Sequence, residues 1–157
     1  MKFLFVSLVI ISLSSYSQDV SKIRSIDSLV NIINRSKLSV QVDSLKTDGN
    51  PGGISSQSYV TTWRKGREVK KYVNKTYIQA QQNGTTQKME TIISFYYDRN
   101  TVLKVEQSMT KGSAKSKSEF YYYNDKPIYS TPSMVGSSLV SQSMLANAKE
   151  ILKTLSE

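Results

Sequence analysis

The chain has 157 residues, no cysteine and no histidine, and its 21 lysines and arginines outnumber 12 aspartates and glutamates, giving a formal net charge of +9. The missing residue types exclude disulfides and remove the commonest general base and the preferred ligands of zinc, copper and iron, which disfavours most enzyme classes. This length suits a single domain, and the positive charge favours contact with polyanions without identifying a partner.

The amino terminus has the residue order of a secretory signal peptide. Lys2 precedes an apolar run over 3–11 that only Ser7 interrupts, and a serine-rich stretch follows over 12–17. This run is too short to cross a bilayer, which takes about 20 apolar residues. We therefore predict cleavage near Ser17 and Gln18, which leaves 18–157 as one domain. We expect it in the bacterial periplasm or secreted, without membrane insertion after cleavage and without a cysteine to carry a lipid.

The first element predicted in the mature domain is an amphipathic helix over about 20–36. Apolar residues recur there at helical spacing, at Ile23, Ile26, Val30 and Ile33. The following stretch, 37–56, stays open because its apolar residues fit both a strand and a helix. Several glycines and a proline within it predict a flexible loop over about 47–56.

From Tyr59 onward, apolar and aromatic residues alternate with polar ones, which predicts an antiparallel meander. Lys65-Gly66 marks one turn. The last hairpin is expected around Asn124-Asp125, although the pattern does not fix its register. Pro127 lacks the N–H that a strand donates to its neighbour, so the returning strand is expected at an edge of the sheet.

The best-specified hairpin turns through residues 98–100. Its two strands carry their apolar residues at odd-numbered positions, namely Met89, Ile93, Phe95 and Tyr97, and then Leu103, Val105 and Met109. Opposed residues of a hairpin have a constant sum of residue numbers, so both sets share a face only if that sum is even. A three-residue loop ending in a left-handed residue satisfies this condition. We therefore expect Phe95 opposite Leu103 and Ile93 opposite Val105.

A second amphipathic helix is predicted to open at 136–138. Its apolar stripe comprises Leu139, Leu145, Ala148, Ile151, Leu152 and Leu155. Each helix has one stripe to bury and the sheet has one consistently apolar side, so both helices are expected on the same sheet face. The predicted fold is α+β, with an N-terminal helix, an antiparallel meander of four to six strands and a C-terminal helix.

Two kinds of catalytic site need neither histidine nor cysteine: a carboxylate pair, and a serine with a lysine base. The acidic residues form no recognisable motif, and the serine-lysine segment 113–117 lacks the Ser-x-x-Lys spacing on a helix. We therefore assign no catalytic, cofactor-binding or metal-binding residue and do not expect an enzyme. Export and the lack of an RNA-binding motif argue against a nucleic-acid partner.

Aromatic and basic residues of the strands are the remaining candidates. Strand tyrosines mostly pack, but the neighbours of Tyr122 point away from it, so this strand has aromatic side chains on both faces. The candidate partner-binding face consists of Lys104, Lys115, Lys117, Tyr121 and Tyr123. The alternative is a solvated surface whose lysines pair with Glu106 or Glu119 across the strands.

Three functions follow from these observations. The first is a non-catalytic periplasmic module that binds an unknown protein or an anionic envelope component. The second is a carrier that holds an apolar small molecule or lipid between sheet and helices, in a cavity beneath Trp63, Phe95 and Leu103. The third, which the missing residue types disfavour, is a histidine-free hydrolase. The oligomeric state stays open.

Overall fold

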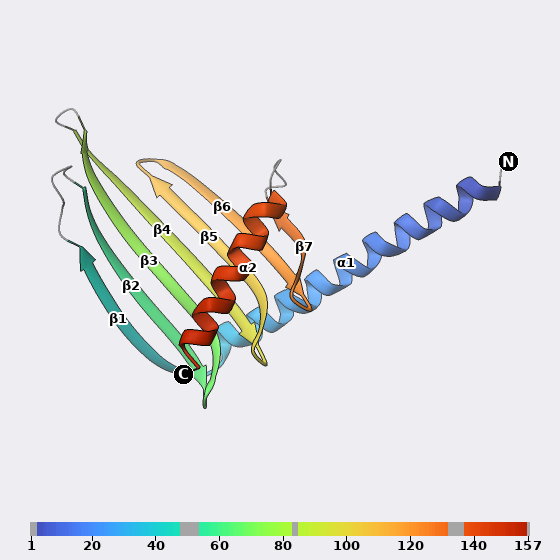
Figure 1. Cartoon of the computed structure of the whole chain (residues 1–157), viewed down its shortest axis with the longest axis horizontal. Coiled ribbons are helices and arrows are strands. Elements are labelled where there is room, and N and C mark those ends of the chain that lie inside the picture. Colours follow the sequence, from blue (N-terminus) through green and yellow to red (C-terminus); the bar gives the residue numbers. More distant parts are fainter. Residues whose placement is uncertain (1–2, 48–53, 83–84, 132–136, 157) are drawn as a thin grey trace.

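The computed structural model describes residues 3–47, 54–82, 85–131 and 137–156. Seven strands form one antiparallel sheet in which each strand pairs with its sequence neighbours, and a helix lies at each end of the chain (Figure 1). The elements are α1 (Phe3–Arg35), β1 (Ser39–Thr47), β2 (Ile54–Lys65), β3 (Glu68–Gln82), β4 (Thr85–Asp98), β5 (Thr101–Lys111), β6 (Ala114–Tyr123), β7 (Lys126–Thr131) and α2 (Ser137–Thr154). The predicted α+β class and element order are confirmed.

The strand number differs from the expected four to six because the ambiguous stretch 37–56 contributes a further strand. β1 ends at Thr47 and β2 begins at Ile54, so both strands enter the segment expected to be a loop, whose centre lies outside the described residues. The first helix begins at Phe3 rather than near residue 20. In the described part of the chain, no helix is both long and apolar enough to cross a membrane.

Three hairpins at one end of the sheet share one construction. β2–β3, β4–β5 and β6–β7 each close through two residues, which are Gly66-Arg67, Arg99-Asn100 and Asn124-Asp125. Two residue pairs beyond each turn, the register shifts by one, which leaves an extra residue on the returning strand: Lys70, Leu103 and Ile128. Such an extra residue is a β-bulge. We call the end with these turns the bulged end and the opposite end the distal end.

The bulge in β5 changes the register expected for the β4–β5 hairpin. Phe95 pairs with Val105, and Ile93 pairs with Gln107, where Leu103 and Val105 were expected. The turn contains two residues rather than three, and both have positive φ, as in the tight turns that suit twisted hairpins. Beyond the bulge, paired residues have an even sum, as predicted, but the extra residue Leu103 supplies it instead of an odd loop; the two pairs next to the turn have an odd sum.

The two helices cover opposite faces of the bulged end, whereas both were expected on one face (Figure 1). The cluster on the α1 face contains Ile26, Val30, Ile33, Tyr96 and Tyr121. The cluster on the α2 face includes Phe95, Tyr97, Val105, Phe120, Tyr122, Leu145, Ala148 and Leu152. β4 and β6 carry consecutive aromatic residues, and consecutive side chains of a strand point to opposite faces. Both faces are therefore apolar here, and each needs a helix.

Hydrogen bonds from two buried tyrosines fix α2 on its face. The hydroxyl of Tyr97 donates to the carbonyl oxygen of Ala148 at 3.1 Å, and that of Tyr122 donates to the carbonyl oxygen of Ser141 at 2.8 Å. Burial raises the pKa of Tyr122 to about 12, so its hydroxyl remains a donor across the physiological range. These tyrosines occupy equivalent places in two of the bulged hairpins, one residue pair before the register shift.

The apolar stripe predicted for the second helix is confirmed in its last three turns. Leu139 is the exception, because 72% of its surface is exposed. Nine residues separate Leu139 from the fully buried Ala148, and nine steps of about 100° place the two on opposite sides of a helix. Ser141 lies on the buried side instead.

We predict that Tyr97→Phe lowers the free energy of unfolding by about 1 kcal/mol, because it removes a hydrogen bond whose acceptor lies in the core. Tyr129→Phe is the matched control, since Tyr129 is exposed on edge strand β7. Urea denaturation followed by circular dichroism measures both. Equal stability of the two variants would contradict the role given to Tyr97.

Candidate functional site

A row of alternating aromatic and lysine side chains crosses the sheet on the α1 face. From β2 to β7 its members are Trp63, Lys71, Tyr96, Lys104, Tyr121 and Tyr129. The ammonium of Lys71 lies 5.1 Å from the ring centres of both Trp63 and Tyr96, and that of Lys104 lies 4.5 Å from the ring centre of Tyr121. At these distances the ring face attracts the cation. We call these six residues the aromatic-lysine row.

Lys104 is the most strongly bound member of the row. Its Nζ lies 3.1 Å from Oδ1 of Asp27, 3.0 Å from Oε1 of Glu106 and 3.1 Å from Oε1 of Glu119, and only 5% of the residue is exposed. Burial lowers the pKa of Lys104, but its contacts with Tyr121 and the three carboxylates outweigh burial and raise the pKa above its usual value. The ammonium therefore stays charged in a place where an unpaired cation would be costly.

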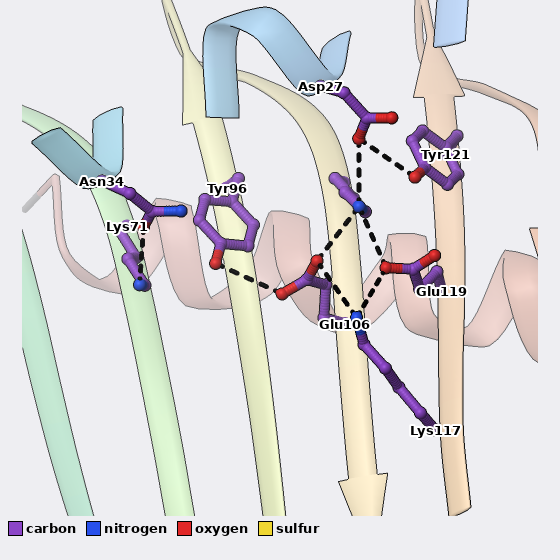
Figure 2. A network of polar contacts seen from close by, with 9 residues as sticks. Asp27, Asn34, Lys71, Tyr96, Glu106, Lys117, Glu119 and Tyr121 are labelled. Atoms are coloured by element: carbon purple, nitrogen blue, oxygen red, sulfur yellow. Dashed lines mark hydrogen bonds and ion pairs between the residues drawn. The ribbon is translucent and has the colours of Figure 1, made fainter. Parts of the chain in front are cut away.

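Helix α1 is aligned along the row by two of its polar residues (Figure 2). Asp27 binds Lys104, and Asn34 accepts a hydrogen bond of 2.8 Å from Lys71. Seven helical residues span about 10.5 Å, and the two lysines stand two strands apart, about 9.6 Å. The two spacings match, so α1 crosses the strands with one polar contact above each lysine.

The structure removes two residues from the candidate partner-binding face. Lys104 and Tyr121 do share the face of β5 and β6 expected for them, but α1 covers both, and 4% of Tyr121 is exposed. The hydroxyl of Tyr121 donates to Asp27 at 3.0 Å. Both residues were expected to be accessible because both helices were placed on the other face. Lys104 does pair with Glu119 on the neighbouring strand, as the alternative expected, and also with Glu106 on its own strand, but α1 covers the surface that the alternative expected to be solvated.

The other three candidate residues are exposed but do not lie together. Lys115 and Lys117 lie in the distal half of β6, and Lys117 binds Glu119 at 2.8 Å. Tyr123 lies at the bulged end, where the ammonium of Lys22 is 5.1 Å from the centre of its ring. The five residues therefore belong to three places: a buried network, the distal end and the edge of α1.

Two pairs of carboxylates converge on the α1 side of the sheet, and each pair shares a lysine. Glu106 and Glu119 share Lys104, while Glu68 and Asp98 each lie 2.7 Å from Nζ of Lys70. Burial raises the pKa of Glu119, but hydrogen bonds from lysines outweigh it and the net pKa is lowered. The pKa of Glu68 is likewise lowered, chiefly by its hydrogen bond to Lys70. Such carboxylates stay ionised near neutral pH and are poor proton donors.

Beyond α1, the same sheet face carries a second group of aromatic and basic residues. They are Tyr59, Lys75, Tyr77, Lys88, Lys115 and Lys117, which we call the distal patch. The rings of Tyr59 and Tyr77 meet edge to face with centres 6.2 Å apart. Lys75 lies 4.8 Å from the ring centre of Tyr77 and 2.6 Å from a carboxylate oxygen of Glu90.

Lys88 and Lys115 differ from the other lysines of the distal patch. Both are exposed, and neither forms an ion pair with any residue that the structure describes. Sequence reasoning did not select Lys88, Tyr59 or Tyr77. The available signal was their alternation with the apolar residues of β2, β3 and β4, which places all of them on one face once the register is known.

The expected ligand cavity beneath Trp63, Phe95 and Leu103 does not exist as a single space. Phe95 is buried in the cluster on the α2 face, while Leu103 packs on the α1 face and Trp63 belongs to the aromatic-lysine row. A groove of about 800 Å³ lies elsewhere, at the distal end. Ile78, Met89 and Ala114 are among the residues that line it.

Comparison with known proteins adds no assignment, because the chain matches no family model and resembles neither a curated protein nor a solved structure detectably. Among the described residues, no group of three acidic side chains is placed to hold a metal ion. The features that remain as candidate binding surfaces are the distal patch and the distal groove.

We predict that Lys104→Met lowers the free energy of unfolding by about 3 kcal/mol at neutral pH, because it leaves three carboxylates facing one another. The folded pKa of Glu119 lies below its usual 4.5, so its stabilising contribution is present above that pH and is lost as the pH falls through the folded pKa. The difference between variant and wild type should therefore shrink in acid. Urea denaturation at neutral and acidic pH measures it.

Lys115→Met is the control for this experiment, because it removes the same charge from the same sheet face without an ion-pair partner among the described residues. Its stability should stay within about 0.5 kcal/mol of wild type. A Lys104→Met variant as stable as this control at neutral pH would contradict the structural role of Lys104.

Proposed function

We propose that this chain is an exported, non-catalytic binding module that contacts an anionic partner through the distal patch. The observation that carries the proposal is the pair of exposed lysines Lys88 and Lys115, which have no ion-pair partner among the described residues. They share with exposed Tyr59 and Tyr77 a sheet face that α1 leaves uncovered there. An expected signal peptide and the disfavoured enzyme classes support the rest of the proposal.

Charge and shape both support an anionic partner at this place. The distal patch contains four lysines, of which Lys75 and Lys117 are neutralised by glutamates within the chain. The other two have no such partner in the part of the chain that the structure describes, so an incoming anion can pair with them without breaking an ion pair seen there. Tyrosine rings add flat apolar area with little loss of side-chain freedom, which favours them in binding surfaces. A sulfated, phosphorylated or carboxylated envelope polymer has the matching chemistry.

The groove at the distal end supports a second candidate function. Its apolar lining by Ile78, Met89 and Ala114 suits a small apolar molecule, and its volume of about 800 Å³ lies within the range usual for ligand sites. A carrier would use this groove rather than the space beneath the helices. A hydrolase is less well supported, because lysines lower the pKa of Glu68 and of Glu119 and so disfavour them as proton donors.

We predict that the double variant Lys88→Ala/Lys115→Ala elutes from immobilised heparin, a sulfated polysaccharide, at clearly lower salt than wild type. Each lysine that contacts a polyanion contributes to the salt dependence of binding, so removing two should weaken retention and flatten that dependence. The elution salt concentration of the purified full chain is the measurement.

Lys126→Ala/Lys153→Ala is the matched control, because it removes two exposed lysines from the bulged end and changes the net charge equally. The control should elute close to wild type. An equal shift of both double variants would show that net charge alone governs retention and would reject the distal patch as a binding site.

A further inference from the structure

The two edges of the sheet differ in how they are protected. β7 has six residues and contains Pro127, which has no N–H to offer a further strand. β1 has nine residues, Ser39–Thr47, without proline or glycine, and the described chain places no strand on its outer side. Proteins usually protect an exposed edge by shortness, proline or charge, because its free N–H and C=O groups otherwise accept another strand. β7 is protected by its shortness and by Pro127, whereas β1 is long and proline-free and has only the charges of Asp43 and Lys46.

The side chains of β1 are also unusual for an edge in contact with water. Val40, Val42 and Leu45 have 54%, 63% and 69% of their surface exposed. Val40 and Val42 point to the α1 face, where they neighbour Trp63 and Thr61 of β2, and Leu45 points to the other face. Exposed apolar residues on both faces beside unpaired backbone groups are typical of a strand that pairs with another chain.

We propose that β1 pairs in antiparallel fashion with β1 of a second copy, so that two sheets join into one. The strand is suited to pair with itself around Val42. A twofold axis perpendicular to the sheet keeps the α1 faces of both copies on one side. Opposed residues then belong to the same face of each copy, and because side chains alternate along a strand, their numbers have an even sum. An axis at Val42 places the two Val42 side chains together and sets Gln41 opposite Asp43 of the partner subunit.

An axis at Val42 places the polar side chains of β1 more favourably than an axis at Asp43. The amide of Gln41 already donates to a carboxylate oxygen of Asp43 within one strand at 3.2 Å, so the same donor and acceptor are available across the axis. Moving the axis to Asp43 would place that residue opposite Asp43 of the partner subunit, and like charges directly opposite are unfavourable. In the proposed dimer both distal patches face the same side, so one polymer could engage both.

Engineered cysteines test the proposal directly, because the natural chain has none. Val42→Cys places the two thiols at the axis, whereas Leu45→Cys places them six residues apart along the paired strands, roughly 20 Å. A disulfide requires Cα atoms within about 7 Å. With the full chain under mild oxidation, we expect Val42→Cys to form covalent dimer roughly ten times faster than Leu45→Cys or more, although Leu45 is the more exposed residue.

Light scattering of the wild-type chain provides the second measurement. We expect its mass to rise from monomer towards dimer with concentration, and Val42→Lys to remain monomeric with unchanged circular dichroism, because it places two cations at the axis. A wild-type chain that stays monomeric over the same concentrations would overturn the proposal. So would faster crosslinking through Leu45→Cys than through Val42→Cys, which would require a different register.

Discussion

Side chains alternate between the two faces of every strand, and this constraint, interrupted once in each of three hairpins, organises the whole molecule. Each of these hairpins closes through a two-residue turn, and the bulge adds one residue to the returning strand. The extra residue shifts the register by one, which changes the residues that lie opposite one another on each sheet face. Consecutive tyrosines in β4 and β6 then face opposite directions, so the bulged end has two apolar faces and requires two helices. The distal end lacks this double aromatic lining, and its strands extend beyond both helices (Figure 1).

The attachment of α1 combines apolar burial with one costly polar site. Ile26, Val30 and Ile33 supply the apolar contact, and Asp27 meets a lysine that is almost completely buried. A buried ion pair is weak support for stability in general, but removing one partner leaves a charge without compensation. The arrangement around Lys104 therefore acts as a constraint on where α1 can lie rather than as a source of large net stability. The same site buries Lys104 and Tyr121, which the sequence alone would place on a binding surface.

The sequence predicts the parts of this fold that follow from local chemistry. The α+β class, the order of elements and the edge position of Pro127 are confirmed, and so is the even-sum rule for the β4–β5 hairpin. Its register was wrong because periodicity does not reveal a bulge, and Leu103 fits either face until its partner is known. The accessibility of Lys104 and Tyr121 was wrong because it depended on the face chosen for α1. β1 stayed open between strand and helix because Leu38, Val40 and Val42 alternate like a strand, while Leu38, Val42 and Leu45 also keep helical spacing.

The molecule therefore has a helix-covered end, which holds the fold together, and an uncovered distal end, where we propose that binding takes place. We infer that α1 is docked on the sheet through the site around Lys104. Hydrogen exchange of the backbone amides between Ile23 and Ile33 tests this claim most directly, in the wild-type chain and in Asp27→Asn. Slow exchange in wild type, with faster exchange in the variant confined to α1, is the result the account predicts. Rapid exchange throughout α1 in the wild-type chain, or an equal acceleration in α1 and α2 in the variant, would contradict it.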